Sequence, residues 1–178
     1  QHNSLLFYPV QYEGIEQSPN IVYTGAAPNQ QIIPAVEWCF RELRARKFFL
    51  VGSDYVFPRT AHAIVKAEVQ RLGGQTVGDV YVLLGSPGVK AAVAGIAARQ
   101  PDVILNCING DGNITFFDEL RDAGVTPSSV PTVSVSVAED ELRSIGTRQM
   151  AGDYCAWNYF QSVDTEQNRA FVTRFQSM

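Results

Sequence analysis

The fold is indicated first by the stretch Phe49-Leu-Val-Gly-Ser-Asp-Tyr-Val-Phe-Pro-Arg59. Its apolar start predicts a buried strand that ends at Gly52, and a helix is predicted to follow over residues 60–72. In an open parallel sheet, ligands bind beyond the carboxyl ends of the strands. We therefore expect Tyr55 and Phe57, in the turn between strand and helix, to line a ligand-binding groove with much of their area exposed.

Strand and helix patterns alternate along the rest of the chain. Such alternation favours an α/β fold, a three-layer sandwich in which a mainly parallel sheet is covered by helices on both faces. A turn is expected at Gly85-Ser-Pro-Gly88. Strands are predicted over residues 20–24, 48–52, 76–84, 103–107, 132–136 and 153–157, and helices over residues 31–44, 60–72, 89–99, 114–123 and 139–145.

Composition excludes several classes of protein. The longest apolar runs, residues 80–84 and 91–98, fall short of the ~20 residues needed to cross a bilayer. A net charge of -4 with interspersed signs argues against a nucleic-acid partner, because phosphate binding needs a basic stripe. The three cysteines, Cys39, Cys107 and Cys155, show no metal-ligand spacing and are interpreted as small buried hydrophobes, so no metal is expected.

Two further loops follow predicted strands. The segment Asn106-Cys-Ile-Asn-Gly-Asp-Gly-Asn113 ends one strand, and Asp111 in it either caps the next helix or contacts a ligand. Glu139 lies just beyond the strand predicted over residues 132–136, and it too is either a first-turn helix residue or a ligand contact. Because the carboxyl ends of parallel strands meet at one edge, we expect these loops and Tyr55 to converge.

No catalytic machinery is apparent in the sequence. The histidines, His2 and His62, have no nucleophile nearby in sequence, and no Gly-x-Ser-x-Gly elbow occurs. Paired carboxylates would require Asp54, Asp111 and Glu139 to meet in space with shifted pKa values. Aromatic and amide groups at strand ends instead suit a small, neutral, polar ligand that is bound rather than transformed. We therefore expect no enzyme activity and no cofactor.

Five runs of sequence resemble one branch of a known family. The chain is similar to the urea and short-chain-amide branch of the type I periplasmic binding proteins, and within it to the substrate-binding subunit of urea ABC transporters. The similarity extends over nearly all of residues 5–178. The runs are Leu6-Phe-Tyr-Pro-Val-Gln-Tyr-Glu-Gly14, Ser18-Pro-Asn-Ile-Val-Tyr-Thr-Gly25, Ala27-Pro-Asn-Gln30, Leu50-Val-Gly-Ser-Asp-Tyr-Val-Phe-Pro-Arg-Thr60 and Ser134-Val-Ser-Val-Ala-Glu139.

The resemblance implies a set of ligand-binding residues. Tyr8 and Gln11 correspond to the segment that leaves the first lobe and touches the ligand. Tyr55 and Phe57 correspond to the aromatic pair by which the second lobe closes over it. The amide sensors of this branch carry Tyr where this chain has Phe57, so a ligand-facing hydroxyl is lost. Asn109, together with Asp111 and Glu139 above, lies in corresponding loops.

The resemblance also implies what the protein does. Members consist of two α/β lobes that close around a ligand without chemistry, and they run to roughly twice this length. Gln1 is not a natural start, so we expect a longer chain. Residues 1–30 are expected to form the end of the first lobe and a crossover segment, and residues 31–158 to form the second lobe. Residues 159–178 are expected to form the return crossover and a helix over residues 164–176.

Three functional classes remain open at this point, and the third is an enzyme on a flavodoxin-like sheet, which the fold alone does not exclude. The first is capture of urea or a short-chain amide for the membrane subunits of an ABC transporter, in the periplasm or another extracytoplasmic position. The second is ligand sensing by the same fold in a signalling protein or amide-responsive regulator. A single lobe holds half of such a site, so we expect it to bind amides weakly. Its exposed aromatic residues would favour a homodimer.

Overall fold

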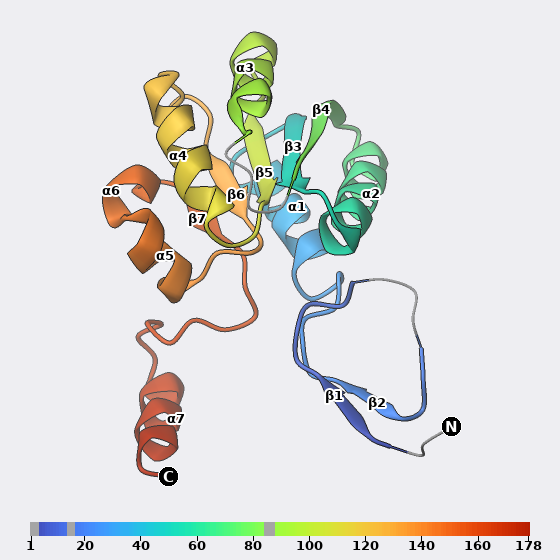
Figure 1. Ribbon diagram of the computed structural model, residues 1–178, viewed down its shortest axis with the longest axis vertical. Helices are drawn as coiled ribbons and strands as arrows, with labels where there is room; N and C mark the ends of the chain where they lie inside the picture. Colours follow the sequence, from blue (N-terminus) through green and yellow to red (C-terminus); the bar gives the residue numbers. More distant parts are fainter. Residues whose placement is uncertain (1–3, 14–16, 84–87) are drawn as a thin grey trace.

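The central element is a parallel sheet of five strands, seen in a computed structural model that describes residues 4–13, 17–83 and 88–178 (Figure 1). His2 and residues 85–87 of the predicted turn lie outside these ranges. The strand order is β4-β3-β5-β6-β7, and all four neighbouring pairs are parallel. The strands of this sheet are β3 (Lys47–Ser53), β4 (Gln75–Val82), β5 (Val103–Cys107), β6 (Thr132–Ser134) and β7 (Tyr154–Cys155).

Helices cover both faces of the sheet (Figure 1). One core lies between the sheet and α1 and α2, and it contains Phe48, Leu50 and Leu105. A second core lies on the opposite face, where Phe49 and Ile104 pack against the remaining lobe helices. The predicted three-layer α/β fold is confirmed. The helices are α1 (Ile32–Arg41), α2 (Val56–Arg71), α3 (Lys90–Arg99), α4 (Gly112–Asp122), α5 (Glu139–Ile145) and α6 (Thr147–Met150).

The start of α2 differs from the prediction. The helix begins at Val56, four residues before the expected start at Thr60, with Tyr55 in an extended conformation as its N-cap. Pro58 in the stretch was interpreted as part of a turn. Proline is tolerated in the first turn of a helix, because the backbone N–H that it lacks has no intrahelical partner there.

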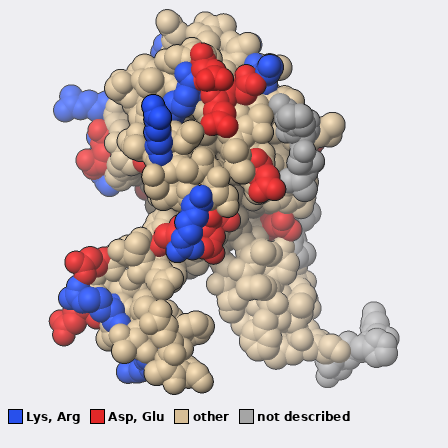
Figure 2. Space-filling view, turned by 60° about the vertical axis from the view of Figure 1, so that its left-hand side comes forward, with Lys and Arg blue, Asp and Glu red and all other residues tan. Residues whose placement is uncertain are grey.

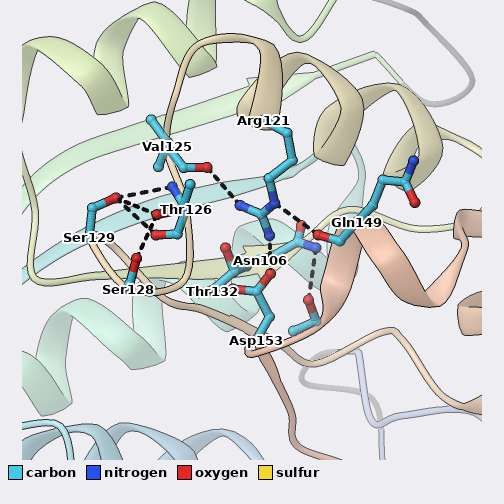
Figure 3. Close-up of polar contacts among 10 residues, drawn as sticks. Asn106, Arg121, Val125, Thr126, Ser128, Ser129, Thr132, Gln149 and Asp153 are labelled. Atoms are coloured by element: carbon cyan, nitrogen blue, oxygen red, sulfur yellow. Dashed lines mark hydrogen bonds and ion pairs between the residues drawn. The ribbon is translucent and has the colours of Figure 1, made fainter.

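A partly buried ion pair lies at the amino end of the strands, on the face of the sheet that α4 covers (Figure 3). The guanidinium group of Arg121 on α4 pairs with Asp153 and donates to the backbone carbonyls of Gln149 and Val125, at 2.8 Å each. The Asp153 carboxylate also accepts from the backbone N–H of Thr132 at 2.8 Å. This network ties α4 to the starts of β6 and β7, opposite the carboxyl edge where a ligand is expected.

Two elements project from one end of the lobe (Figure 1). A small parallel sheet is formed by β1 (Leu6–Tyr8) and β2 (Ile21–Tyr23), and α7 (Glu166–Gln176) ends the chain. Both carry exposed apolar side chains: Phe7 is 62% exposed on β1, and Phe175 is 68% exposed on α7. Within the described ranges, no helix is both long and apolar enough to cross a bilayer.

Candidate functional site

The carboxyl ends of β3 and β5 form the point where the strand order reverses. From β3 the chain crosses one way to β4, and from β5 it continues the other way to β6. The loops that leave this point therefore diverge, and small ligands bind in the resulting crevice. The two loops are joined by a hydrogen bond of 3.1 Å from the backbone N–H of Asn109 to the hydroxyl of buried Ser53.

Tyr55 stands at this point as the residue before α2. Its side chain is half-buried, and its ring centroid lies 6.5 Å from that of Phe57. Burial raises the pKa of the Tyr55 phenol, and the negative charge of Glu13 raises it further. The phenol is therefore protonated at neutral pH and available as a hydrogen-bond donor.

Phe57 does not line the groove, and the prediction that its ring is exposed is wrong. The side chain is 2% exposed and packs in the core between α2 and the sheet. Because α2 begins at Val56, Phe57 lies on the same helical face as the buried Ala61 and Val65, four and eight residues later. Val56 is 52% exposed instead. Phe57 therefore belongs to the core cluster against which the ring of Tyr55 packs.

Asn109 lies in a loop that is held by buried amides. The side chain of Asn106, at the end of β5, donates to the side-chain oxygen of Asn113 at 2.8 Å and accepts from the backbone N–H of Ile108 at 2.9 Å. Asn113 in turn donates to the backbone carbonyl of Ile108 at 2.9 Å. The side chain of Asn109 is half-buried and donates to the carbonyl of Cys107 at 3.1 Å. Its amide oxygen faces no donor among the described residues.

The segment between β1 and β2 reaches the lobe through Gln11. The side-chain nitrogen of Gln11 donates to the backbone carbonyl of Val135, just after β6, at 2.6 Å, and to the side-chain oxygen of Gln31 at 2.7 Å. In the same segment the hydroxyl of Tyr8 donates to the carboxylate of Glu13 at 2.9 Å. The structure thus brings Gln11 to the edge of the sheet where Tyr55 lies, whereas the hydroxyl of Tyr8 contacts Glu13.

Glu13 was not among the residues selected from the sequence. It is the penultimate residue of the quoted run from Leu6 to Gly14. A signal was present, since it is a carboxylate close in sequence to the aromatic residues Tyr8 and Tyr12. No local periodicity marks such a residue, because its contacts depend on how the segment folds back.

Asp111 and Glu139 occupy the neighbouring loops. Asp111 is exposed at the start of α4, makes no side-chain capping bond and lines a shallow hollow of about 160 Å³ with residues of α5. Glu139 accepts from the backbone N–H and hydroxyl of Ser162, at 2.9 and 2.8 Å. The capping contact of α5 is made by Glu141, which accepts from the backbone N–H of Ala138. Among the described residues, neither Asp111 nor Glu139 hydrogen-bonds to Tyr55 or Asn109.

A histidine and a cysteine lie beneath the site, fully buried. His62 contacts the carboxylate of Asp79 at 2.7 Å, and the side chains of His62 and Cys107 both lie close to Gly52. Burial lowers the pKa of His62, and Asp79 opposes this effect in part. Burial also raises the pKa of the Cys107 thiol well above its ordinary value. A buried thiol of raised pKa is inert. Among the described residues the site therefore offers groups for binding and no activated nucleophile.

A family model described as a periplasmic binding protein domain matches residues 1–178. The chain belongs to the periplasmic binding protein family. The strand order β4-β3-β5-β6-β7 and the helices on both faces match one lobe of a type I periplasmic binding protein. Members of this family are generally not enzymes.

Solved structures of periplasmic binding proteins resemble the chain. A substrate-binding protein of an amino acid ABC transporter from Pseudomonas fluorescens Pf-5 has a TM-score of 0.81 at 18% identity, over 98% of this chain and 48% of its own. A solute-binding protein of an ABC transporter from Rhodopseudomonas palustris HaA2, in complex with p-hydroxybenzoic acid, has a TM-score of 0.79 at 25% identity, over 90% of this chain and 44% of its own. The chain thus spans less than half the length of these proteins.

The ligands named for these structures differ from the one expected from the sequence. They include p-hydroxybenzoic acid and, for a leucine binding protein from Thermotoga maritima MSB8 with a TM-score of 0.73 at 17% identity, an amino acid. That protein is matched over 89% of this chain and 45% of its own length. The similarity therefore supports a solute-binding fold and leaves urea or amide specificity to be tested.

Proposed function

We propose that this chain supplies one lobe of a solute-binding protein that captures urea or a short-chain amide by two-lobe closure and delivers it to the membrane subunits of an ABC transporter. The single observation that carries the proposal is the pair of groups at the strand-order reversal. Tyr55 offers a protonated phenol there, and Asn109 offers a half-buried amide. A neutral amide has both a carbonyl acceptor and N–H donors, and these two side chains match them.

The second support is the position of the segment that contains Tyr8 and Gln11. This segment is hydrogen-bonded to the carboxyl end of β6 through Gln11, and this bond supports the assignment of Tyr8 to the same site. We assign Tyr8, Gln11, Tyr55, Asn109, Asp111 and Glu139 to the ligand-facing edge, with Phe57 as its support. Closure against the first lobe would bury their polar groups and strengthen each hydrogen bond to the ligand.

The remainder of the first lobe is expected to pack on the projecting elements. Residues 1–30 and 159–178 are assigned to the crossovers and to parts of the first lobe, and residues 31–158 to the second lobe. The exposed Leu6 and Phe7 on β1, and Phe171 and Phe175 on α7, support this division because apolar side chains in such numbers are usually covered. The protein is proposed to act outside the cytoplasm, as its family does.

An aromatic acid is the second candidate ligand, favoured by the solved structure with p-hydroxybenzoic acid at 25% identity. Calorimetric titration of the protein that contains both lobes separates the candidates. We expect saturable binding of urea or acetamide and much weaker binding of 4-hydroxybenzoate. Tight binding of 4-hydroxybenzoate without binding of either amide would overturn the proposed ligand class. Residues 1–178 alone are expected to bind acetamide far more weakly than the two-lobe protein.

A further inference from the structure

Glu13 is held in place at the edge of the site. Its carboxylate is half-buried and accepts from the Tyr8 hydroxyl at 2.9 Å. The residues around it are fixed as well: Gln11 is bonded to Val135, and the backbone N–H of Tyr12 donates to the carbonyl of Ala26 at 3.1 Å. The carboxylate therefore has a defined position and does not move freely in solvent.

Within the described ranges of the chain, no cation pairs with the charge of Glu13. The sequence contains no Lys or Arg before Arg41, and the projecting β1–β2 region is correspondingly free of basic side chains in Figure 2. Arg59, near the start of α2, pairs with Asp54 at 2.6 Å and lies over the ring of Tyr81 at 4.5 Å. Among the described residues, Glu13 takes part in no ion pair.

The carboxylate also has unused hydrogen-bonding capacity. Tyr8 is the one donor to Glu13 within the described parts of the chain. An ionised carboxylate has two oxygens and accepts about four hydrogen bonds. A partly buried acceptor without donors is unfavourable, so a ligand with N–H groups gains by supplying them.

Glu13 and Tyr55 approach the site from different segments. Tyr55 precedes α2 at the end of β3, whereas Glu13 comes from the segment between β1 and β2. After burial, the charge of Glu13 is the next largest cause of the raised pKa of Tyr55. The Glu13 carboxylate therefore lies within electrostatic range of the Tyr55 phenol.

We propose that Glu13 selects the ligand by charge: its carboxylate accepts N–H groups of a neutral amide and repels the carboxylate of an organic acid. The inference rests on the proposed function, because it assigns a group to the same site. It also gives a physical basis for discrimination between amides and the aromatic acids bound by similar structures. A site with an unpaired carboxylate binds an anion poorly, since like charges in a partly desolvated site repel strongly.

The competing interpretation is that Glu13 only positions Tyr8. A positioning role would change the binding of all ligands by a similar factor. A selective role changes the ratio between amide and acid affinities. That ratio is the quantity to measure.

The test is calorimetric titration of the two-lobe protein with acetamide and with benzoate, at constant ionic strength. We compare the native protein with Glu13→Gln, whose side-chain oxygen still accepts from Tyr8. The matched control is Glu42→Gln, which removes the same charge from an exposed side chain at the end of α1. We expect Glu13→Gln to lower the acetamide-to-benzoate affinity ratio about tenfold or more, since a hydrogen bond to a charged group is worth at least that factor. Glu42→Gln should leave the ratio unchanged.

Two further outcomes keep the inference separate from the proposed function. A variant Glu13→Asp retains the charge and is expected to keep the discrimination against benzoate. If the native protein binds benzoate and no amide, the proposed ligand class fails, and the inference is then judged on benzoate alone. In that case Glu13→Gln must bind benzoate about tenfold more tightly. An unchanged affinity ratio, or unchanged benzoate binding in that case, overturns the role of Glu13.

Discussion

The side-chain nitrogen of Gln11 donates a hydrogen bond of 2.6 Å to the backbone carbonyl of Val135, which lies 124 residues further along the chain. Gln31 donates to the same carbonyl at 2.8 Å and to the carbonyl of Ala156 at 2.7 Å. Two amide side chains thus join the segment before α1, the end of β6 and the segment after β7. In the proposed division, the segments before α1 and after β7 are those by which the chain enters and leaves the second lobe.

Replacement of Gln11 by Ala is expected to loosen the segment that carries Tyr8. The change removes two hydrogen bonds and leaves the side-chain oxygen of Gln31 without its donor, so the loss of stability should be about 1–2 kcal/mol. Denaturation in guanidinium chloride measures it, and limited proteolysis should show faster cleavage near residues 9–13. Gln70→Ala, at an exposed position on α2, serves as the control. Equal effects of the two changes would contradict the assignment.

Phe57→Ala is expected to cost far more stability than Val56→Ala, although the two residues are adjacent. Phe57 is buried in the core between α2 and the sheet, and removal of such a ring typically costs about 3–5 kcal/mol. Val56 is exposed, and its truncation should change the unfolding free energy by about 0.5 kcal/mol or less. The unfolding free energies of both variants are compared in guanidinium chloride. Urea is avoided as the denaturant because it is a proposed ligand. A larger stability loss for Val56→Ala than for Phe57→Ala would indicate that Phe57 is exposed.

Asn106→Leu is expected to disturb the loop that carries Asn109. The substitution keeps the side-chain volume but removes the partners of Asn113 and of the Ile108 backbone N–H. Each buried group left unpaired costs about 1–3 kcal/mol. Amide hydrogen exchange should become faster at residues 108–111, and ligand affinity should fall. Asn158→Leu changes an exposed residue and should leave exchange in this loop as it was.

The contact between Glu139 and Ser162 is expected to weaken in acid. The backbone N–H of Ser162 is the largest cause that holds the pKa of Glu139 below its ordinary value of 4.5. A lowered folded-state pKa means that the ionised form contributes stability above pH 4.5, and that this contribution is lost as the pH falls through the folded value.

Glu139→Gln should therefore be less stable than the native protein at pH 7, by about 1 kcal/mol or less for an exposed contact of this kind. The difference should shrink as the pH falls below 4.5. Thermal melting across this range measures it, and Ser162→Ala, which removes the hydroxyl and keeps the backbone donor, should show a smaller loss. A difference that does not depend on pH would exclude ionised Glu139 as the cause.

Secondary structure was predictable where local pattern and burial agree. β5 and α5 have the bounds expected from the sequence, because an apolar run and an acidic first turn mark them without reference to other segments. β1 was not expected, since its residues Leu6 and Phe7 are exposed in the described structure and follow no alternating pattern. The four-residue α6 was also missed, because it is too short to show a helical period.

The candidate site was predictable as a location and only in part as a set of residues. The carboxyl ends of β3 and β5 follow from the strand order, and Tyr55 and Asn109 lie there. The direction of Phe57 depended on where α2 starts, and a shift of the helix start turns a side chain from the surface to the core.

The sequence by itself determined the alternation of strands and helices, the parallel sheet that this alternation requires, and the resemblance to a solute-binding family. These properties depend on short-range pattern, because each element buries one face and its neighbours in sequence supply the connection. Only the tertiary structure decided that Gln11 meets Val135 and that Glu13 meets Tyr8 with no cation beside it in the described chain. The contact between Gln11 and Val135 joins residues 124 apart, which no periodicity relates, and it exists only after the segment that carries Gln11 has packed against the end of β6.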